Sequence, residues 1–143
     1  MRVLIDTNVW LSYLMSRQGN SPVRRVVLSC LLGDEVMLVM PEEVIEELRH
    51  SATYAHLAQR IAADELEFLI EQIRLVALTP PALRSETPRY SRDAQDDYLI
   101  AHAIEHDVDY LITGDRDLLV LERIEGLTIL NPKAFESLLK RDE

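Results

Sequence analysis

Four acidic residues occupy positions where strands or buried helices should meet one edge of a fold. Asp6 and Asp115 each follow a short apolar run. Glu47 and Asp97 lie beside apolar residues that recur at helical spacing. Carboxylates that converge in space repel one another unless a cation neutralises them. This arrangement therefore indicates a cation site, although each residue taken singly also fits a solvated surface charge.

The chemistry open to such a cluster follows from its ligand atoms. An all-oxygen ligand set with open positions suits Mg²⁺ or Mn²⁺, which retain waters and bind phosphate oxygens well. Such an ion supports hydrolysis of a phosphodiester, because it activates water and stabilises charge on the phosphate. The neighbouring pairs Glu46/Glu47 and Asp96/Asp97 leave open, by one residue, which member is the ligand.

The first apolar run organises the predicted fold. Residues 3–5 are consecutive and apolar, which is typical of a strand buried on both faces of a parallel sheet. Asp6 then lies where that strand ends, the edge at which binding sites collect in open parallel sheets. Asn8 is suited to cap the helix that follows. If the first and fourth strands are neighbours, a crevice opens between Asp6 and Asp115.

Strand and helix patterns alternate along the rest of the chain, which predicts one α/β domain over residues 1–143. The expected strands are 3–5, 36–40, 75–78, 110–112 and 127–130. Helices are expected over 9–15, 22–32, 41–48, much of 52–73, 94–106 and about 118–121, and from 132 onward.

Composition limits the class of protein. The formal net charge of −10 argues against a protein that coats nucleic acid by electrostatics alone. No stretch approaches the roughly 20 apolar residues of a membrane span, and no signal-peptide pattern is present, so we expect a cytoplasmic protein. The single cysteine, Cys30, excludes an internal disulfide and a cysteine-based zinc site.

The acidic residues lie in four blocks: LIDTNV (4–9), EEL (46–48), DYLIA (97–101) and LITGDRDLL (111–119). Together these blocks resemble those of PIN-domain nucleases. Their order and spacing are similar to the branch identified as toxins of toxin–antitoxin pairs. One departure is Pro41, since relatives often have a serine at the start of that helix.

The resemblance implies a three-layer α/β/α sandwich whose five-stranded parallel sheet has the order 3-2-1-4-5. It implies a ribonuclease that depends on Mg²⁺ or Mn²⁺, an RNA substrate, an antitoxin partner and a homodimer. The metal-binding and catalytic residues that it implies are Asp6, Glu47, Asp97 and Asp115, with Asp117 as an additional acid at the metal and Asn8 and Thr113 as hydrogen-bonding residues around them.

The loop over residues 79–93 is a candidate RNA contact, because long loops in compact domains are often functional. It contains Arg84, Arg89 and Arg92 together with Tyr90. Arginine binds phosphate through two parallel hydrogen bonds, and tyrosine stacks on unpaired bases. An ordinary surface connection, in which the arginines pair with nearby carboxylates, stays open as the alternative.

Other functions fit the sequence less well. A phosphate-accepting signalling domain needs an aspartate directly after the third strand, where Leu78-Thr79-Pro80 offers none. A phosphatase with an aspartyl nucleophile needs a second aspartate at the position of Asn8. A glycine-rich nucleotide loop is excluded, because the chain has four glycines and no cluster. A catalytically weak or inactive PIN-like module that acts through a protein partner remains open.

Overall fold

A five-stranded sheet forms the centre of the computed structural model, which describes residues 1–16, 19–83, 90 and 96–141. Strand β1 pairs in parallel with a neighbour on each side, and β3 and β5 are also parallel. Strand β4 is antiparallel to β5 at one edge. From edge to edge the strands are β2 (Met37–Leu38), β1 (Arg2–Ile5), β3 (Tyr110–Ile112), β5 (Leu127–Leu130) and β4 (Arg123–Ile124).

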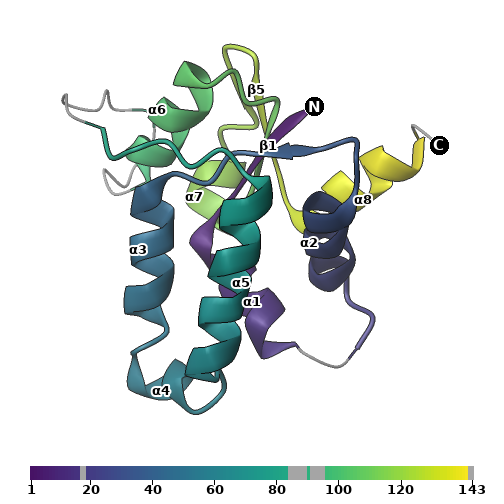
Figure 1. Ribbon diagram of the computed structural model, residues 1–143. Coiled ribbons are helices and arrows are strands. Elements are labelled where there is room, and N and C mark those ends of the chain that lie inside the picture. Colours follow the sequence, from purple (N-terminus) through teal and green to yellow (C-terminus); the bar gives the residue numbers. More distant parts are fainter. Residues whose placement is uncertain (17–18, 84–89, 91–95, 142–143) are drawn as a thin grey trace.

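Helices flank this sheet on both sides, with α2 and α8 packed together on one side of β1 and α6 on the other (Figure 1). The α/β fold class predicted from the sequence is therefore confirmed. None of the described helices is long and apolar enough to cross a membrane. The helices are α1 (Thr7–Met15), α2 (Pro22–Leu32), α3 (Glu42–Ser51), α4 (Ala55–Ala58), α5 (Ala63–Val76), α6 (Asp97–Glu105), α7 (Arg116–Leu119) and α8 (Pro132–Arg141).

The ends of α2 follow directly from the sequence. The Ser21 hydroxyl accepts a hydrogen bond from the backbone N–H of Arg24 at 3.1 Å, and Pro22 occupies the first turn. At the other end, the backbone N–H of Gly33 donates to the carbonyl of Ser29. A Cβ at position 33 would lie 2.5 Å from that carbonyl oxygen, so the close approach requires glycine.

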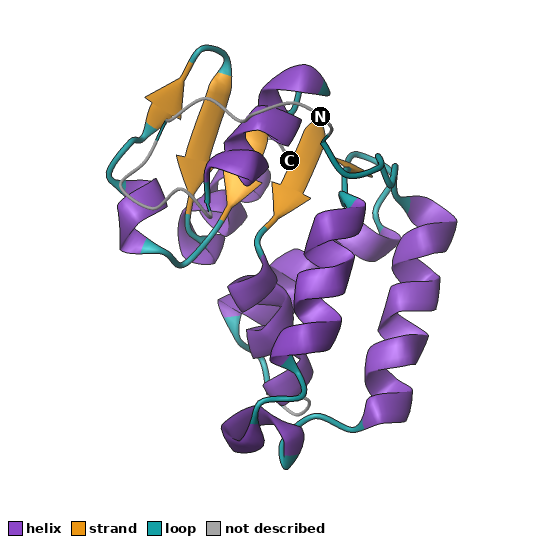
Figure 2. Ribbon diagram, turned by 90° about the vertical axis from the view of Figure 1, so that its left-hand side faces the viewer, coloured by secondary structure: helices purple, strands orange, loops and turns teal. Residues whose placement is uncertain are grey.

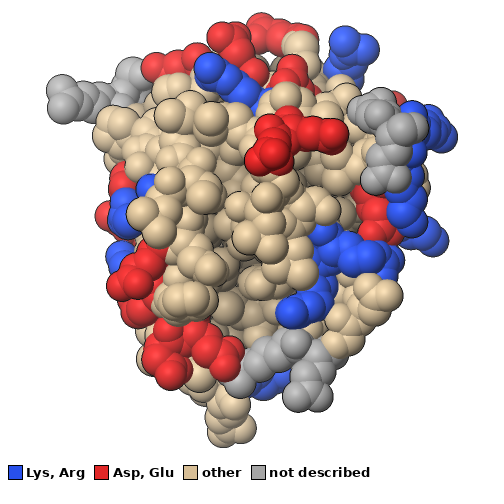
Figure 3. All heavy atoms as spheres, turned by 45° about the vertical axis from the view of Figure 1, so that its right-hand side comes forward, with Lys and Arg blue, Asp and Glu red and all other residues tan. Residues whose placement is uncertain are grey.

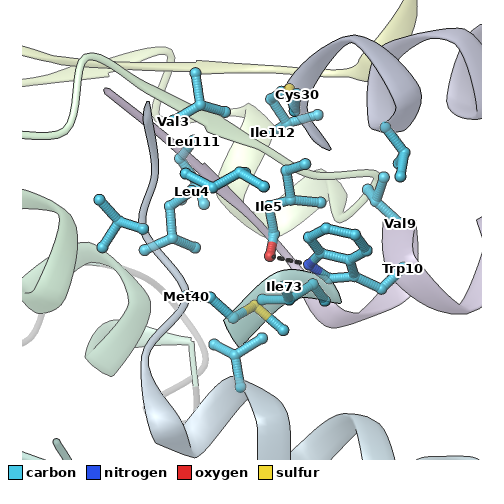
Figure 4. Packing of buried hydrophobic residues seen from close by; sticks show 14 of the residues in the cluster. Val3, Leu4, Ile5, Val9, Trp10, Cys30, Met40, Ile73, Leu111 and Ile112 are labelled. Atoms are coloured by element: carbon cyan, nitrogen blue, oxygen red, sulfur yellow. Dashed lines mark hydrogen bonds between the residues drawn. The ribbon is translucent and has the colours of Figure 1, made fainter. Parts of the chain in front are cut away.

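The core begins with β1, since Val3, Leu4 and Ile5 are fully buried. Figure 4 shows Trp10 of α1 packed beside Ile5, with Met40 and Ile73 nearby. The Trp10 indole N–H donates to the Ile5 carbonyl at 3.0 Å, which satisfies a buried backbone acceptor at the end of the strand. Strand β1 and helix α1 are therefore held together at the point where Asp6 joins them.

The predicted third strand, residues 75–78, is wrong in extent. Helix α5 continues through Val76, and only Leu78 pairs, in a single bridge with Val39. The helical spacing of buried Leu66, Leu69 and Ile73 extends the helix up to this point. Two prolines follow Thr79 and lack the N–H groups that would extend the pairing.

The sheet order therefore differs slightly from 3-2-1-4-5. The order of the strands on either side of β1 is as predicted, but the expected third strand is reduced to that bridge. Strand β4, which the sequence did not indicate, adds an antiparallel edge instead, and its Ile124 pairs with Leu127 across a two-residue turn.

The predicted cap at Asn8 is also wrong. Helix α1 begins at Thr7 directly after β1, and Asp6 is its N-cap residue. Asn8 lies inside the first turn, where its side-chain oxygen accepts a hydrogen bond from the backbone N–H of Gly114 at 3.4 Å. The strand passes into the helix without a connecting loop, so the carboxylate performs the capping role.

Helices α3 and α5 stand side by side, joined through α4 (Figures 1 and 2). Two ion pairs connect them: Arg74 with Glu42 at 2.6 Å and Arg49 with Glu67 at 2.9 Å. Each such exposed pair contributes about 0–1 kcal/mol to stability, so the buried apolar faces of the helices dominate their packing.

The two phenylalanines of the chain offer a matched test of this core. Phe135 of α8 is fully buried, whereas Phe68 of α5 is 61% exposed. We expect Phe135→Ala to lower the free energy of unfolding by about 3–5 kcal/mol. At protein concentrations low enough to keep the chain monomeric, Phe68→Ala should change it by less than about 0.5 kcal/mol. Urea unfolding followed by circular dichroism measures both, and equal losses would contradict the assigned packing of α8.

Candidate active site

Asp6 is a buried carboxylate fixed between two strands. Its backbone N–H donates to the carbonyl of Ile112, which continues the pairing of β1 with β3 by one residue. Its side chain is 6% exposed. One carboxylate oxygen accepts a hydrogen bond from the Thr7 N–H at 2.7 Å, and the other accepts one from the Thr113 hydroxyl at 2.8 Å.

Thr113 links this carboxylate to the next acidic residue. It follows β3 and is fully buried. While its hydroxyl donates to Asp6, its oxygen accepts a hydrogen bond from the backbone N–H of Asp115 at 3.0 Å. Asp115 in turn caps α7, and its carboxylate accepts a hydrogen bond from the backbone N–H of Asp117 at 2.9 Å. Asp6 and Asp115 therefore follow neighbouring strands, as the sequence predicts.

The electrostatic environment of Asp6 disfavours its charged form. Burial raises the pKa of Asp6 from the ordinary 3.8 to about 6, and the charges of Glu47 and Asp115 add to the increase. The hydrogen bonds from Thr113 and Thr7 oppose it and are too weak to cancel it. A carboxylate kept desolvated beside two others is the environment that a cation stabilises.

Glu47 reaches this region from α3 and forms a hydrogen bond with α6. The Tyr98 hydroxyl donates to a carboxylate oxygen of Glu47. Burial is the largest cause that raises the pKa of the Tyr98 phenol, followed by this hydrogen bond and by the charges of Glu47, Asp6 and Glu43. One turn away, Glu43 pairs with the ring Nε2 of His102.

Asp97 lies at the start of α6 and is 1% exposed. Its Oδ1 accepts a hydrogen bond from the backbone N–H of Tyr90 at 3.0 Å. The Tyr90 side chain is half-buried and packs against the core, so its ring is only partly available to a base. Arg84, Arg89 and Arg92 lie outside the described residues.

The acidic residues fit a divalent cation in kind, because Asp6, Glu47 and Asp115 offer oxygen ligands and their charges act on one another. Among the residues that the structure describes, no three carboxylate, imidazole or thiolate groups already stand in an arrangement that could hold a metal ion. Glu47 is exposed on the surface of α3.

Sequence reasoning missed the part that Tyr98, His102 and Glu43 play in this environment. A signal existed in the spacing, because Glu43 and Glu47 are four residues apart in one helix and Tyr98 and His102 are four apart in another. Residues at that spacing lie on one helix face. Nothing in the sequence indicated that these two faces meet.

A sequence profile described as the PIN domain matches residues 2–117. The chain belongs to the PIN-domain family. The resemblance seen in the four acidic blocks is thereby confirmed, and all four blocks fall at least partly within the matched residues. Members of this family are nucleases.

The PIN-domain fold is also found among solved structures. A chain of VapBC2 from Rickettsia felis, solved bound to a DNA fragment from their promoter, superposes with a TM-score of 0.58 and is 14% identical. The match covers 92% of this chain and 98% of that one. At this identity the likeness concerns the fold. The comparison with curated proteins found no match.

The raised pKa of Asp6 predicts a pH-dependent stability for the metal-free protein. Between pH 3.8 and about 6, the folded protein holds a proton on Asp6 that the unfolded chain releases. The associated stability is full below pH 3.8 and is lost as the pH rises through about 6. Asp6→Asn removes this loss, so at pH 7.5 in EDTA we expect a gain of roughly 1–3 kcal/mol in the free energy of unfolding.

The gain should shrink toward zero when the unfolding is repeated at pH 4, where Asp6 is neutral. The exposed carboxyl-to-amide change Asp34→Asn is the matched control and should alter stability little at either pH. A gain of equal size at both pH values would contradict the assigned cause.

Proposed function

We propose that this PIN-domain chain is an endoribonuclease that depends on Mg²⁺ or Mn²⁺ and acts as the toxin of a toxin–antitoxin pair. The observation that carries the proposal is the buried carboxylate of Asp6. It is fixed between β1 and β3, and Glu47 and Asp115 lie close enough to raise its pKa. A fold that keeps such a carboxylate in place against the cost of burial supports a role in binding a cation.

In this proposal Asp6, Glu47, Asp97 and Asp115 hold the metal ion, with Asp117 as an additional acid. When bound, the ion supplies an activated water and stabilises charge on the scissile phosphate. Thr113 keeps the Asp6 carboxylate oriented through the hydrogen bond described above, since a hydroxyl donor fixes which oxygen faces the crevice. Asn8 holds the backbone at Gly114, directly before Asp115.

The substrate would be single-stranded RNA. The acidic domain needs local positive charge to guide a polyanion, and the loop residues Arg84, Arg89 and Arg92 are the proposed source. Tyr90 is proposed as an RNA contact beside them. This part of the proposal rests on the sequence.

The partner would be an antitoxin that inserts an arginine or lysine among the carboxylates and neutralises them as a metal ion does. The solved relative in fold supports this by analogy, because it comes from VapBC2 and was solved with DNA from their promoter.

A homodimer is proposed as well. Figure 3 shows a face of the molecule with a broad area of uncharged side chains beside groups of acidic and basic ones. Large apolar side chains are exposed on α2 and α5: Leu32 is 75% exposed, Phe68 61% and Leu75 86%. An interface between two copies would remove such side chains from water.

The nuclease proposal predicts metal-dependent cleavage. We expect the purified chain to cut a fluorescent single-stranded RNA in Mg²⁺ or Mn²⁺ and to lose the activity in EDTA. Asp6→Asn should lower the rate by more than about a hundred-fold, because it removes a charged ligand, while Asp34→Asn retains it. Gel analysis of RNA and DNA of the same sequence measures both rate and preference.

Cleavage by Asp6→Asn at the parental rate would contradict the site. Equal cleavage of DNA would contradict the RNA preference. Metal binding without cleavage of either substrate would favour the alternative of an inactive binding module.

The toxin proposal predicts an effect on growth. Induced expression of the chain in bacterial cells should arrest growth, whereas Asp6→Asn, expressed to the same level, should not. Asp34→Asn should arrest growth as the parent does. Growth curves with quantified protein levels measure this. If cells that express the parental chain grow normally although the purified chain cleaves RNA, the toxin proposal is contradicted and the nuclease proposal stands.

A further inference from the structure

Two side-chain pairs connect α3 to α6 beside the acidic residues. Glu43 pairs with His102, and Glu47 accepts a hydrogen bond from Tyr98. The members on each helix are one turn apart, so the two pairs form consecutive rungs between the helices. Only the second rung includes a residue whose charge acts on Asp6.

The ring of Tyr98 has a fixed environment. It contacts the His102 ring edge-on, with centroids 6.4 Å apart and an interplanar angle of 89°. His102 is fully buried and stacks on His106 at 6.0 Å. The first rung and these ring contacts therefore hold the half-buried phenol of Tyr98 in place, with its hydroxyl directed to Glu47.

Glu47 itself is poorly constrained by packing. Its residue is exposed, and a glutamate side chain loses considerable rotamer freedom when it is held in one conformation. A hydrogen bond from a rigid donor restricts the Glu47 rotamers before any ligand binds, so less conformational entropy is lost on binding. The bond takes one of about four lone-pair positions of the carboxylate, so the others stay available to a cation.

We propose that Tyr98 is a positioning residue that orients the Glu47 carboxylate for metal binding through its phenolic O–H. This inference rests on the proposed function of the same site. Hydroxyl and amide donors around ligating carboxylates commonly fix ligand orientation, and their loss weakens metal binding. Tyr98 acts through Glu47 and touches neither substrate nor metal ion in this proposal.

The test compares Tyr98→Phe with Tyr110→Phe. Each change removes one phenolic oxygen, and Tyr110 lies in β3, where its ring packs against Phe135. Mn²⁺ affinity of the metal-free proteins is measured by isothermal titration calorimetry and electron paramagnetic resonance. We expect Tyr98→Phe to weaken Mn²⁺ binding by about 10- to 100-fold, while Tyr110→Phe leaves it unchanged.

A double-variant cycle separates positioning from a general structural effect. If Tyr98 acts through Glu47, then Tyr98→Phe should add no further loss of Mn²⁺ affinity to Glu47→Gln. Urea unfolding in EDTA checks that each variant is folded. Parental Mn²⁺ affinity in Tyr98→Phe, or losses that add fully in the double variant, would overturn the proposal.

The Asp6→Asn variant distinguishes this failure from that of the proposed function. If the parent binds Mn²⁺, Asp6→Asn abolishes that binding and Tyr98→Phe does not change it, only the role of Tyr98 is overturned. A parent that binds no Mn²⁺ overturns both.

Discussion

The burial of the Asp6 carboxylate is the constraint on which the site depends. Strand β1 lies between β2 and β3 and is fully buried over its last three residues, so the residue that follows it is desolvated as well. Two hydrogen-bond donors, the Thr7 N–H and the Thr113 hydroxyl, offset part of that cost. The Thr7 N–H is a local donor at the start of α1, whereas the Thr113 hydroxyl reaches Asp6 only when β1 and β3 are paired. The carboxylate is therefore held by the fold as a whole.

Glu47 has the opposite character. Asp6 is rigid and nearly inaccessible, whereas Glu47 is exposed and held by a single described side-chain contact from the neighbouring helix. In the proposed function, Asp6 would give the cation a defined location and Glu47 would supply a further ligand from α3. In this chain, the sheet and the helices therefore contribute different properties to the same group of acidic residues.

Much of the fold followed from the sequence, because the patterns involved are local. Ser21 with Pro22 marks the start of a helix, and the apolar run at residues 3–5 marks a doubly buried strand. The predicted strand over 75–78 failed because apolar residues at a helix end fit both periods, and two prolines then limit the pairing. The prediction that Asn8 caps the helix was wrong because no loop separates β1 from α1. The helix begins at Thr7, so Asp6 is its N-cap residue.

The environment of the site was less predictable than its acidic residues. Asp6, Glu47 and Asp115 stand out because carboxylates after or beside apolar runs are conspicuous. The contacts of Tyr98 and His102 depend on how α3 and α6 approach each other, and no local pattern encodes that distance. The choice between Glu46 and Glu47 likewise depends on the rotation of α3, and Glu47 is the one whose charge acts on Asp6.

The hydrogen bond from Thr113 to Asp6 joins residues 107 positions apart, and this separation has a consequence for biosynthesis. In the order of synthesis β1 precedes both of its neighbours, and β3 is made long after β2. Pairing between such distant segments is slow to form because a long loop must close first. Until then β1 lacks one of its two neighbouring strands, and Asp6 and Asp115 are not held together. A nascent chain thus has no formed acidic centre until β3 and Asp115 have been made.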